Sequence, residues 1–415
     1  MLSQEFNKLI YDYRVVLFLA FCLTAQILGW RMWLRLVTGK AARRIVHTAF
    51  ILFNLGWFFT VSTLYYGGNL TDFTWLVIGR PSVSWQVVYI FAILPLGVAG
   101  SLLLGLMRRL RGQNRPKGVD AGRRDFLKVA GGTAGGIAIL GTCGYGVIRQ
   151  SLPPEVVRHR LVIDDLPSEL NGFVIAHITD LHLGLWASQA ELDQAMRVVA
   201  AERPDLVAFT GDQVDRSEEN AKLYHRPLQH LKNVPHGVWG VLGNHDHYTG
   251  SPHAVARHLT EGGLTTLMDR QLNLPGLPLS LIGLDDQGIH HSWLGRGGPS
   301  LNHKDDPDAL NFTLVRGPAP RPGDLTILLN HRPEGFAQAA RHGCRLYLAG
   351  HTHGGQYQCP YKDQVNLAAA FYKYSSGLYH EHGAWLNVSR GVAAVGIPFR
   401  LWAWPEVSLL TLTKK

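Results

Sequence analysis

The sequence predicts an α/β protein in which a two-layer β-sandwich is flanked by helices and preceded by an α-helical transmembrane region. Long uncharged apolar runs are confined to the first 150 residues. After them, short apolar runs alternate with amphipathic helical stretches, and the C-terminal stretch is rich in β-formers without helices between them. A chain of 415 residues favours two domains, and we expect a membrane domain at 1–150 and a second domain at 151–415.

The first 150 residues are strongly basic as well as apolar. They hold 17 Lys and Arg against 5 Asp and Glu, a net charge of +12, whereas residues 151–415 hold 23 against 26, a net charge of −3. We predict about four transmembrane helices and a multi-pass protein of the cytoplasmic (inner) membrane, because four apolar runs have roughly the length that crosses a bilayer. The runs cover residues 15–30, 45–66, 82–107 and, more weakly, 129–148.

Basic residues cluster in two loops between these runs, around residues 31–44 and 108–128. By the positive-inside rule both loops are cytoplasmic, which places the second domain outside the cytoplasm. The segment 122–128, with Arg123 and Arg124, resembles a twin-arginine export signal. An ordinary basic flank is the alternative, and both interpretations give the same orientation. If one weak run is instead a buried soluble helix, the second domain faces the cytoplasm.

Strand-length apolar runs recur through the second domain, and helical stretches separate them. This alternation favours a largely parallel central sheet. Ser188 and Glu191 form a capping box that opens one helix, and Pro204 stops it; Pro333 suits the first turn of another helix, and Gly343 its end. The predicted strands are 173–179, 206–210, 238–242, 279–284, 325–329 and 346–349, and 384–388, 401–404 and 407–412 are expected to form a second sheet.

Five short motifs follow these apolar runs, where strands end. Ligands bind beyond the carboxyl ends of strands in open α/β sheets, so we expect the motifs to meet in one crevice. Their Asp, Asn and His side chains, without Cys, suit hard or borderline divalent cations and predict a two-metal hydrolytic site. The motifs are Asp180-x-His182, Gly211-Asp212-x-x-Asp215-Arg216, Gly243-Asn244-His245-Asp246, an isolated His331, and Gly350-His351-Thr352-His353.

Spacing within the motifs suggests how these side chains act. Residues two apart on a strand point to the same side, so Asp180 with His182, and His351 with His353, are expected to act as pairs. A bridging carboxylate usually holds two cations about 3.5–4 Å apart. Asp212, central in chain order, is the candidate bridge.

From about residue 161 to residue 413 the chain resembles the calcineurin-like metallophosphoesterase superfamily, whose five motifs occur here in the family's order. The resemblance implies two divalent metal ions, of manganese, iron or zinc. It also implies that a metal-bridging hydroxide attacks phosphorus of a phosphodiester, phosphomonoester or pyrophosphate. The implied ligands are Asp180, His182, Asp212 and His353 for one metal, and Asp212, Asn244, His331 and His351 for the other.

The resemblance also implies roles beside the metals. His245 would donate a proton to the leaving oxygen or stabilise the phosphoryl charge, and Asp246 would orient its ring. Arg216 is a candidate phosphate contact, with a salt bridge at a helix start as the alternative. Arg390 is another, with a structural role as its alternative. Ser217 and the Asp246 that ends its motif depart from the Ser/Thr protein phosphatase branch, which disfavours protein substrates.

The sequence segments 180–184, 330–334, 350–356 and 387–391 resemble those of a membrane-attached bacterial branch of the superfamily. Some members of that branch are exported by the twin-arginine route, and others are associated with UDP-2,3-diacylglucosamine pyrophosphatase activity in lipid A biosynthesis. The predicted orientation favours a phosphoester or pyrophosphate of the cell envelope, because nucleotide-activated lipid precursors are expected in the cytoplasm.

The expected partners are the lipid bilayer and a phosphorylated small-molecule or lipid substrate. Nucleic acid is not expected, because the second domain has a net charge of −3. An alternative from a different class is a membrane sensor or carrier whose phosphoesterase fold is only a binding module. Complete ligand sets at every motif count against that alternative.

Overall fold

The computed structural model divides the chain into two compact units, Met1–Ile148 and Arg149–Lys415. It describes residues 39–65, scattered residues elsewhere between 23 and 148, and residues 149–415 except 151, 185, 287–309 and 397–398.

In the first unit, the helix α2 (Lys40–Tyr65) includes residues 45–65 of the second predicted span, at 45–66. Polar residues such as His47 and Asn54 interrupt its apolar sequence. No helix in the described part of the chain combines the length and the apolar character needed to cross a membrane, so a transmembrane helix at 45–66 is not supported. The predicted spans at 15–30, 82–107 and 129–148 and the twin-arginine-like segment lie wholly or mostly outside the described residues.

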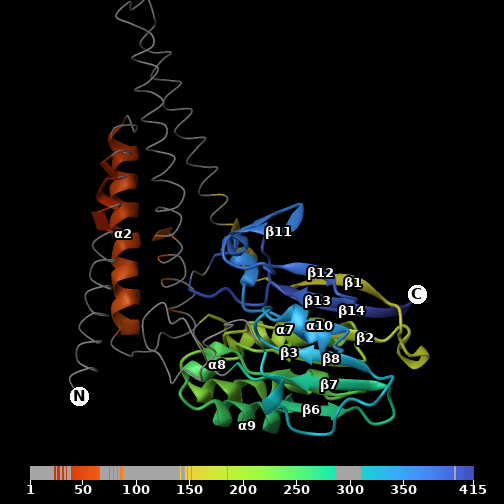
Figure 1. The fold of residues 1–415 in the computed structure, drawn as a ribbon. Coiled ribbons are helices and arrows are strands. Elements are labelled where there is room, and N and C mark those ends of the chain that lie inside the picture. The colour runs from red at the N-terminus through yellow and green to blue at the C-terminus, as the bar shows by residue number, and fades with distance from the viewer. Residues whose placement is uncertain are drawn as a thin grey trace, which may run out of the picture. The chain divides into compact units, whose positions relative to one another are not determined.

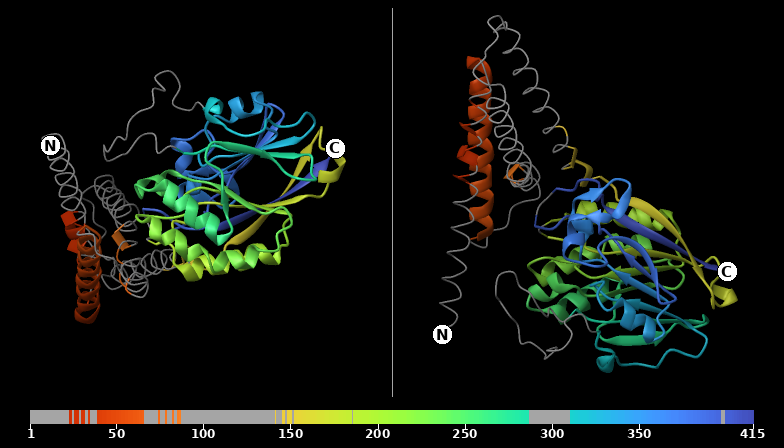
Figure 2. Two further views of the ribbon diagram at one scale, coloured as in Figure 1. Left: turned by 90° about the horizontal axis from the view of Figure 1, so that it is seen from below. Right: turned by 45° about the horizontal axis from the view of Figure 1, so that its top comes forward.

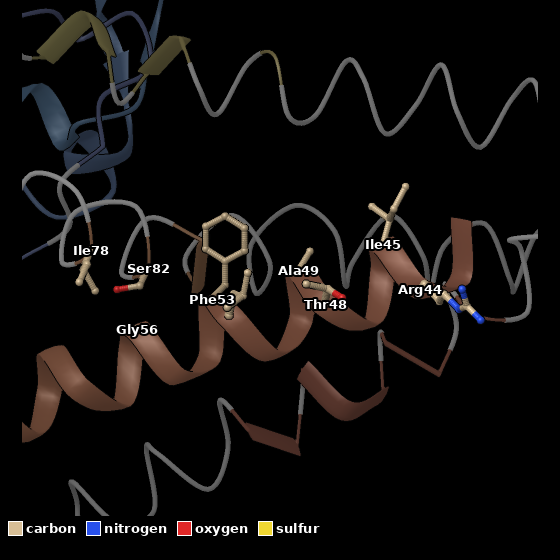
Figure 3. Close-up of a pocket in the computed structure, with 9 residues that line it drawn as sticks. Arg44, Ile45, Thr48, Ala49, Phe53, Gly56, Ile78 and Ser82 are labelled. Atoms are coloured by element: carbon tan, nitrogen blue, oxygen red, sulfur yellow. The ribbon is translucent and has the colours of Figure 1, made fainter. Parts of the chain in front are cut away.

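Polar side chains contact one another beside α2. The Gln26 side-chain amide donates to the side-chain carbonyl of Gln86 (2.8 Å). The NH₂ group of Gln86 donates to the side-chain carbonyl of Asn54 (3.2 Å), and all three side chains are buried. One face of α2, together with Ile78 and Ser82, lines a mainly apolar pocket of about 570 Å³ (Figure 3).

The second unit contains two six-stranded sheets (Figures 1 and 2). In the first, the neighbouring strands β2, β3, β4 and β5 are parallel, and β14 lies between β1 and β2, antiparallel to β2. In sheet order its strands are β1 (Glu155–Ile163), β14 (Glu406–Lys414), β2 (Val174–Ile178), β3 (Leu206–Thr210), β4 (Val238–Val241) and β5 (Thr265–Thr266).

The second sheet has a parallel centre with one antiparallel strand at each edge. In sheet order its strands are β12 (Gly377–Glu381), β13 (Ala384–Val388), β9 (Leu346–Ala349), β8 (Leu325–Leu329), β7 (Leu279–Gly283) and β6 (Arg270–Asn273). A separate hairpin pairs β10 (Gln358–Cys359) with β11 (Lys362–Asn366).

Alternation along the strands explains why two sheets stack. In β3, Leu206 and Ala208 join the core cluster that the two sheets share, whereas Val207 and Phe209 face the helices. In β9, Leu346 enters the shared cluster, and alternate residues face α10. Strands buried on both faces are therefore continuous apolar runs. This arrangement is the expected two-layer sheet flanked by helices.

Sheet membership differs from the expectation. The six predicted strands do not form one central sheet, because β2, β3 and β4 lie in the first sheet and β7, β8 and β9 in the second. The C-terminal strands do not share a sheet either: β13 lies in the second, whereas β14 returns to the first. The predicted strand at 401–404 is not a strand of either sheet, and its residues Leu401 and Trp402 form isolated bridges to Tyr357.

The capping box at the start of α7 is present, since the Ser188 hydroxyl accepts from the Glu191 amide and the Glu191 carboxylate accepts from the Ser188 amide. Helix α10 begins three residues after Pro333, so the prediction for that proline is wrong. The helices are α7 (Gln189–Ala201), α8 (Asn244–Tyr248), α9 (Pro252–Gly262) and α10 (Phe336–Arg341). The 3₁₀ helices are η3 (Ser168–Leu170), η4 (Glu218–Tyr224), η5 (Pro227–Leu231), η6 (Phe312–Leu314), η7 (His353–Gly355) and η8 (Leu367–Ala370).

Candidate metal centre

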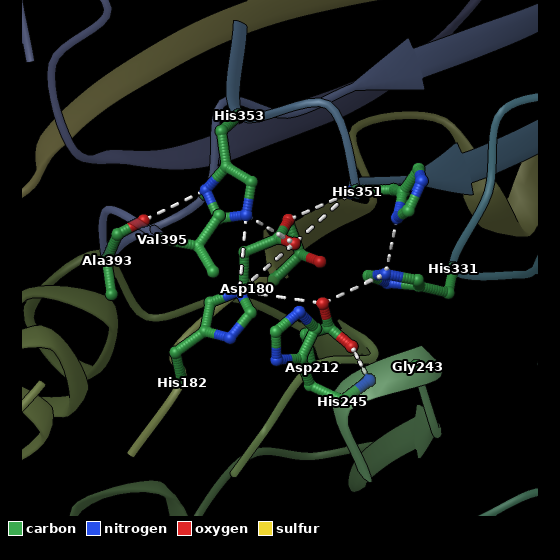
Figure 4. A network of polar contacts seen from close by, with 12 residues as sticks. Asp180, His182, Asp212, Gly243, His245, His331, His351, His353, Ala393 and Val395 are labelled. Carbon is green, nitrogen blue, oxygen red and sulfur yellow. Dashed lines mark hydrogen bonds and ion pairs between the residues drawn. The ribbon is translucent and has the colours of Figure 1, made fainter. Parts of the chain in front are cut away.

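The five motifs converge at the carboxyl ends of strands from both sheets (Figure 4). The loops after β2 and β3 bring two motifs, and α8, which follows β4, brings the third. The loops after β8 and β9 bring the last two from the other sheet. The site thus lies where the two sheets meet, and neither sheet alone holds its donor set.

Unusual backbone conformations aim these side chains. Gly211 has φ 92°, and a Cβ there would lie 2.7 Å from both Gly243 N and His331 Nδ1, so no larger residue fits. Left-handed φ values of 45–70° also occur at Asp180, His182, Asp212, His351 and His353. Such values are uncommon outside glycine and cluster at functional sites.

The first donor cluster contains Asp180, His182 and His353, and all three are buried. His353 Nε2 lies 3.3 Å from Asp180 Oδ1 and 3.2 Å from His182 Nε2. Two imidazole nitrogens and a carboxylate oxygen therefore point at one position. Neutral imidazole and carboxylate are the ligands that Mn²⁺, Fe²⁺ and Zn²⁺ accept.

The second donor cluster contains Asp212, His331 and His351. His331 Nε2 lies 3.1 Å from His351 Nδ1 and 3.2 Å from Asp212 Oδ2. The expectation that His351 and His353 act as one pair is wrong, because they enter different clusters. They follow β9 in a left-handed conformation, where the two-residue period of a strand does not apply.

Asp212, a member of the second cluster, also lies close to the first. Its Oδ2 atom lies 3.2 Å from His331 Nε2 and 3.5 Å from His182 Nε2, so one oxygen faces both positions (Figure 4). Its Oδ1 atom accepts a hydrogen bond from the His245 amide at 2.8 Å, which fixes the carboxylate orientation. A carboxylate in this position would suit a ligand shared by two cations.

Asn244 provides an independent test of whether this donor set fits a metal. Its Oδ1 atom is buried and has no hydrogen-bond partner in the part of the chain that the structure describes. A buried amide oxygen without a partner is costly, and a cation would satisfy it. The site therefore fits divalent metal ions.

Carbonyl and carboxylate oxygens orient the ligand rings from behind. His182 Nδ1 bonds Asp215 Oδ2 (2.9 Å), His331 Nδ1 bonds the Thr210 carbonyl (2.8 Å) and His353 Nδ1 bonds the Ala393 carbonyl (3.0 Å). In each ring the Nε2 atom is left for a metal. Such outer contacts are typical of metal-ligating histidines.

The carboxylate that orients His245 is not the expected one. His245 Nδ1 bonds Asp215 Oδ1 at 2.6 Å, so Asp215 holds both a cluster histidine and the candidate acid. The prediction that Asp246 orients this ring is wrong. The buried Asp246 carboxylate instead accepts from the backbone amides of Gly243 and Gln213, joining the loops after β4 and β3.

The two candidate arginines have different positions. Arg216 is exposed, has φ 64° and forms no ion pair with another described residue, which disfavours the salt-bridge alternative. Arg390 is buried and pairs with Glu406 (2.5 Å) and Glu155 (3.4 Å). The structural alternative therefore accounts for Arg390.

The sequence analysis missed Arg332, which follows His331. Arg332 Nη1 lies 2.9 Å from His351 Nε2, and Arg332 Nε donates to Asp286 Oδ2 at 2.8 Å. The Tyr372 hydroxyl lies 3.3 Å from the same His351 nitrogen. The position of Arg332 next to the isolated motif histidine His331 was the only signal in the sequence for this arginine.

Metal binding is expected to release at least one proton near neutral pH. In the metal-free protein, burial disfavours charge on His331, but Asp212 and Asp180 outweigh it and raise the pKa of this ring to about 10. The ring is thus protonated at neutral pH, and a ligating ring must be neutral, so affinity falls as pH is lowered. Calorimetric titration in buffers of different ionisation enthalpy measures the release. A binding enthalpy independent of the buffer would contradict it.

Comparisons with known proteins identify the family of the chain. Residues 173–355 match the calcineurin-like phosphoesterase family. The metallophosphoesterase YkuE of Bacillus subtilis is 30% identical over 299 residues, 70% of this chain and 97% of that protein. A Danio rerio "transmembrane protein with metallophosphoesterase domain" is 29% identical over 277 residues, 65% of this chain and 59% of that protein. A solved dimetal phosphatase from Danio rerio has a TM-score of 0.31 at 15% identity, covering 54% of this chain and 88% of that one. The chain belongs to the calcineurin-like phosphoesterase family and is a metallophosphoesterase, a hydrolase of phosphoester bonds.

Proposed function

We propose that the chain is a membrane-anchored phosphoester hydrolase that uses two divalent metal ions, of manganese, iron or zinc. Its substrate is a phosphodiester, phosphomonoester or pyrophosphate of the cell envelope. The observation that carries the two-metal proposal is the shared Asp212 Oδ2, which faces both donor clusters. The first cluster together with Asp212 would hold one metal. The second cluster, which includes Asp212, would hold the other metal, with Asn244 as an additional ligand.

The metal ions supply Lewis acidity for the phosphoryl oxygens and a nucleophilic water. The protein supplies the proton for the leaving oxygen. Asp215 accepts the Nδ1 hydrogen of His245, so the transferable proton is on Nε2, and the His245 side chain is 24% exposed and can reach substrate. Asp215 also fixes His182, so it couples the proton donor to a metal ligand.

Arg332 is the proposed phosphate contact. When His351 Nδ1 ligates a metal, its Nε2 atom carries the hydrogen and cannot accept from Arg332. The Arg332 Nη atoms then become available to a phosphate oxygen, while its Nε atom keeps its bond to Asp286.

Replacing Arg332 with Gln is expected to lower kcat/KM about 30-fold, mainly through KM, because a charge-assisted hydrogen bond contributes about 2 kcal/mol. Steady-state kinetics on an aryl phosphodiester measures the change. Arg257→Gln, on the exposed side of α9, is the matched control. An unchanged KM in Arg332→Gln, together with a loss of bound metal, would instead mean that Arg332 supports His351.

Membrane attachment rests on the sequence. The apolar runs at 15–30, 82–107 and 129–148, the basic loops and the description of the Danio rerio relative as a transmembrane protein support it. A reporter fused to the C-terminus tests the orientation. Activity only outside the cytoplasm supports an envelope substrate, whereas activity only inside favours the alternative, UDP-2,3-diacylglucosamine hydrolysis in lipid A biosynthesis.

The direct test is hydrolysis of bis-(p-nitrophenyl) phosphate by the full chain in detergent. The protein is stripped with a chelator, and manganese, iron or zinc is added back. Metal-dependent turnover supports the proposal. Stoichiometric metal binding without turnover on any phosphoester would favour a binding module, and failure to bind metal would remove the site assignment.

A further inference from the structure

Several large apolar side chains are exposed in one short segment beside the metal centre. They lie in residues 357–372, which include the β10–β11 hairpin and η8, and which we call the apolar flap (Figure 1). Tyr361 is 94% exposed, Phe371 75%, Leu367 58% and Val365 52%. Single exposed apolar residues are ordinary, but four within one short segment suit an interaction surface.

The flap is an ordered structure. The Asn366 side chain accepts from the Ala369 amide (3.0 Å) and donates to the Ser375 hydroxyl (2.9 Å). At Gly355 in η7, a Cβ would lie 2.4 Å from the Ala368 amide nitrogen, so the backbones of η7 and η8 touch. The exposure of the apolar side chains is therefore built into the fold.

The flap is also joined to the metal centre. Tyr372, at its end, places its hydroxyl 3.3 Å from His351 Nε2. The preceding residue is the exposed Phe371. A surface that covers Phe371 would therefore lie close to its neighbour Tyr372, whose side chain contacts His351 of the second cluster.

The first residues of the second unit lie near the flap. Tyr357 of the flap forms bridges with Leu401 and Trp402. A few residues on, the Pro405 carbonyl accepts from the Glu155 amide (2.8 Å), and Arg149 lies over the Trp404 ring at 5.6 Å. The second unit therefore begins near the flap, and its first residue, Arg149, follows the predicted span at 129–148 in the sequence.

Trp402 extends this apolar surface. Its side chain is 43% exposed, and its backbone has φ 60°, a strained conformation for a bulky residue. Tryptophan and tyrosine favour the boundary between lipid and water. The exposed Lys362, between Tyr361 and Val365, adds a cation suited to lipid phosphates.

We infer that the apolar flap is a membrane-docking surface, which inserts Tyr361, Val365, Leu367 and Phe371 into the interface of a phospholipid bilayer. The metal centre then faces lipid headgroups, so the substrate class is a phosphoester carried by a membrane lipid. The choice of a bilayer as the partner of the flap rests on the proposed membrane attachment and does not depend on the proposed metal chemistry.

The test uses the full chain with its four cysteines, Cys22, Cys143, Cys344 and Cys359, replaced by alanine. A single substitution, Tyr361→Cys, Val365→Cys or Phe371→Cys, provides the site for an environment-sensitive nitrobenzoxadiazole label. Leu314→Cys and Val162→Cys, at apolar positions 39% and 42% exposed outside the flap, are matched controls. Each protein is reconstituted into phosphatidylcholine and phosphatidylglycerol vesicles with or without doxyl-labelled lipid.

The flap labels are expected to emit at shorter wavelength in vesicles and to be quenched at least about twofold by doxyl lipid, with neither effect at the controls. Water-like, unquenched emission at all three flap positions would overturn the inference. Blue-shifted emission that doxyl lipid does not quench would also overturn it, because a protein surface or a second copy would then cover the flap. Metal-dependent hydrolysis of bis-(p-nitrophenyl) phosphate, measured on the same samples, tests the proposed function separately.

Discussion

Replacing Asp212 with Asn is expected to lower kcat by about 10³-fold, equivalent to about 4 kcal/mol of transition-state stabilisation. The Asp212 Oδ1 atom accepts from the His245 amide, and the Oδ2 atom faces both clusters. An amide has one oxygen, so an asparagine that keeps the bond to the His245 amide turns its NH₂ group toward the metals. That group cannot ligate a cation.

Metal content separates this effect from unfolding. Asp212→Asn is expected to bind less than the full complement of metal, as measured by elemental mass spectrometry, while its circular dichroism stays unchanged. Asp164→Asn removes a charge at an exposed ion pair with Lys415 and is the matched control. Full metal content with normal kcat in Asp212→Asn would remove the shared-ligand assignment.

The convergence of the motifs could be predicted from the sequence because each follows a strand-length apolar run. Such runs specify strands, and the carboxyl ends of parallel strands gather ligands. The sheet to which a strand belongs could not be predicted in the same way. Burial on both faces leaves a strand without the alternation that would mark one face, as in the buried residues 406–410 of β14, and the partners of β14, β1 and β2, are more than 200 residues away in the chain.

Local spacing was misleading at two places. The pairing of His351 with His353 assumed extended backbone, whereas left-handed φ values turn the two rings to different clusters. Asp246 follows His245 directly, yet the carboxylate that bonds the ring is Asp215, 30 residues earlier. The helix α8 turns Asp246 away toward backbone amides, and sequence proximity contains no information about that direction.

Replacing His245 with Ala is expected to reduce activity by an amount that depends on the leaving group. A positioned general acid typically contributes 10²–10⁴-fold, and it matters most when the departing oxygen is a poor leaving group. We expect a loss of about 10³-fold with an alkyl phosphodiester and a much smaller loss with a nitrophenyl ester. Rates for both substrates, measured for wild type and His245→Ala, test this. His253→Ala, at an exposed position on α9, is the matched control.

The pH profile tests the same role, because a general acid works only while protonated. In the metal-free protein, burial opposes charge on His245, but Asp212 and Asp215 outweigh it and raise the pKa of the ring to about 9. Bound cations would lower that pKa, so alkyl-ester hydrolysis is expected to decline with rising pH at or below about 9. Asp215→Asn removes a contact that favours the protonated ring and is expected to move the decline to lower pH. An unchanged profile in Asp215→Asn, together with equal losses for both leaving groups in His245→Ala, would mean that His245 stabilises phosphoryl charge and does not donate the proton.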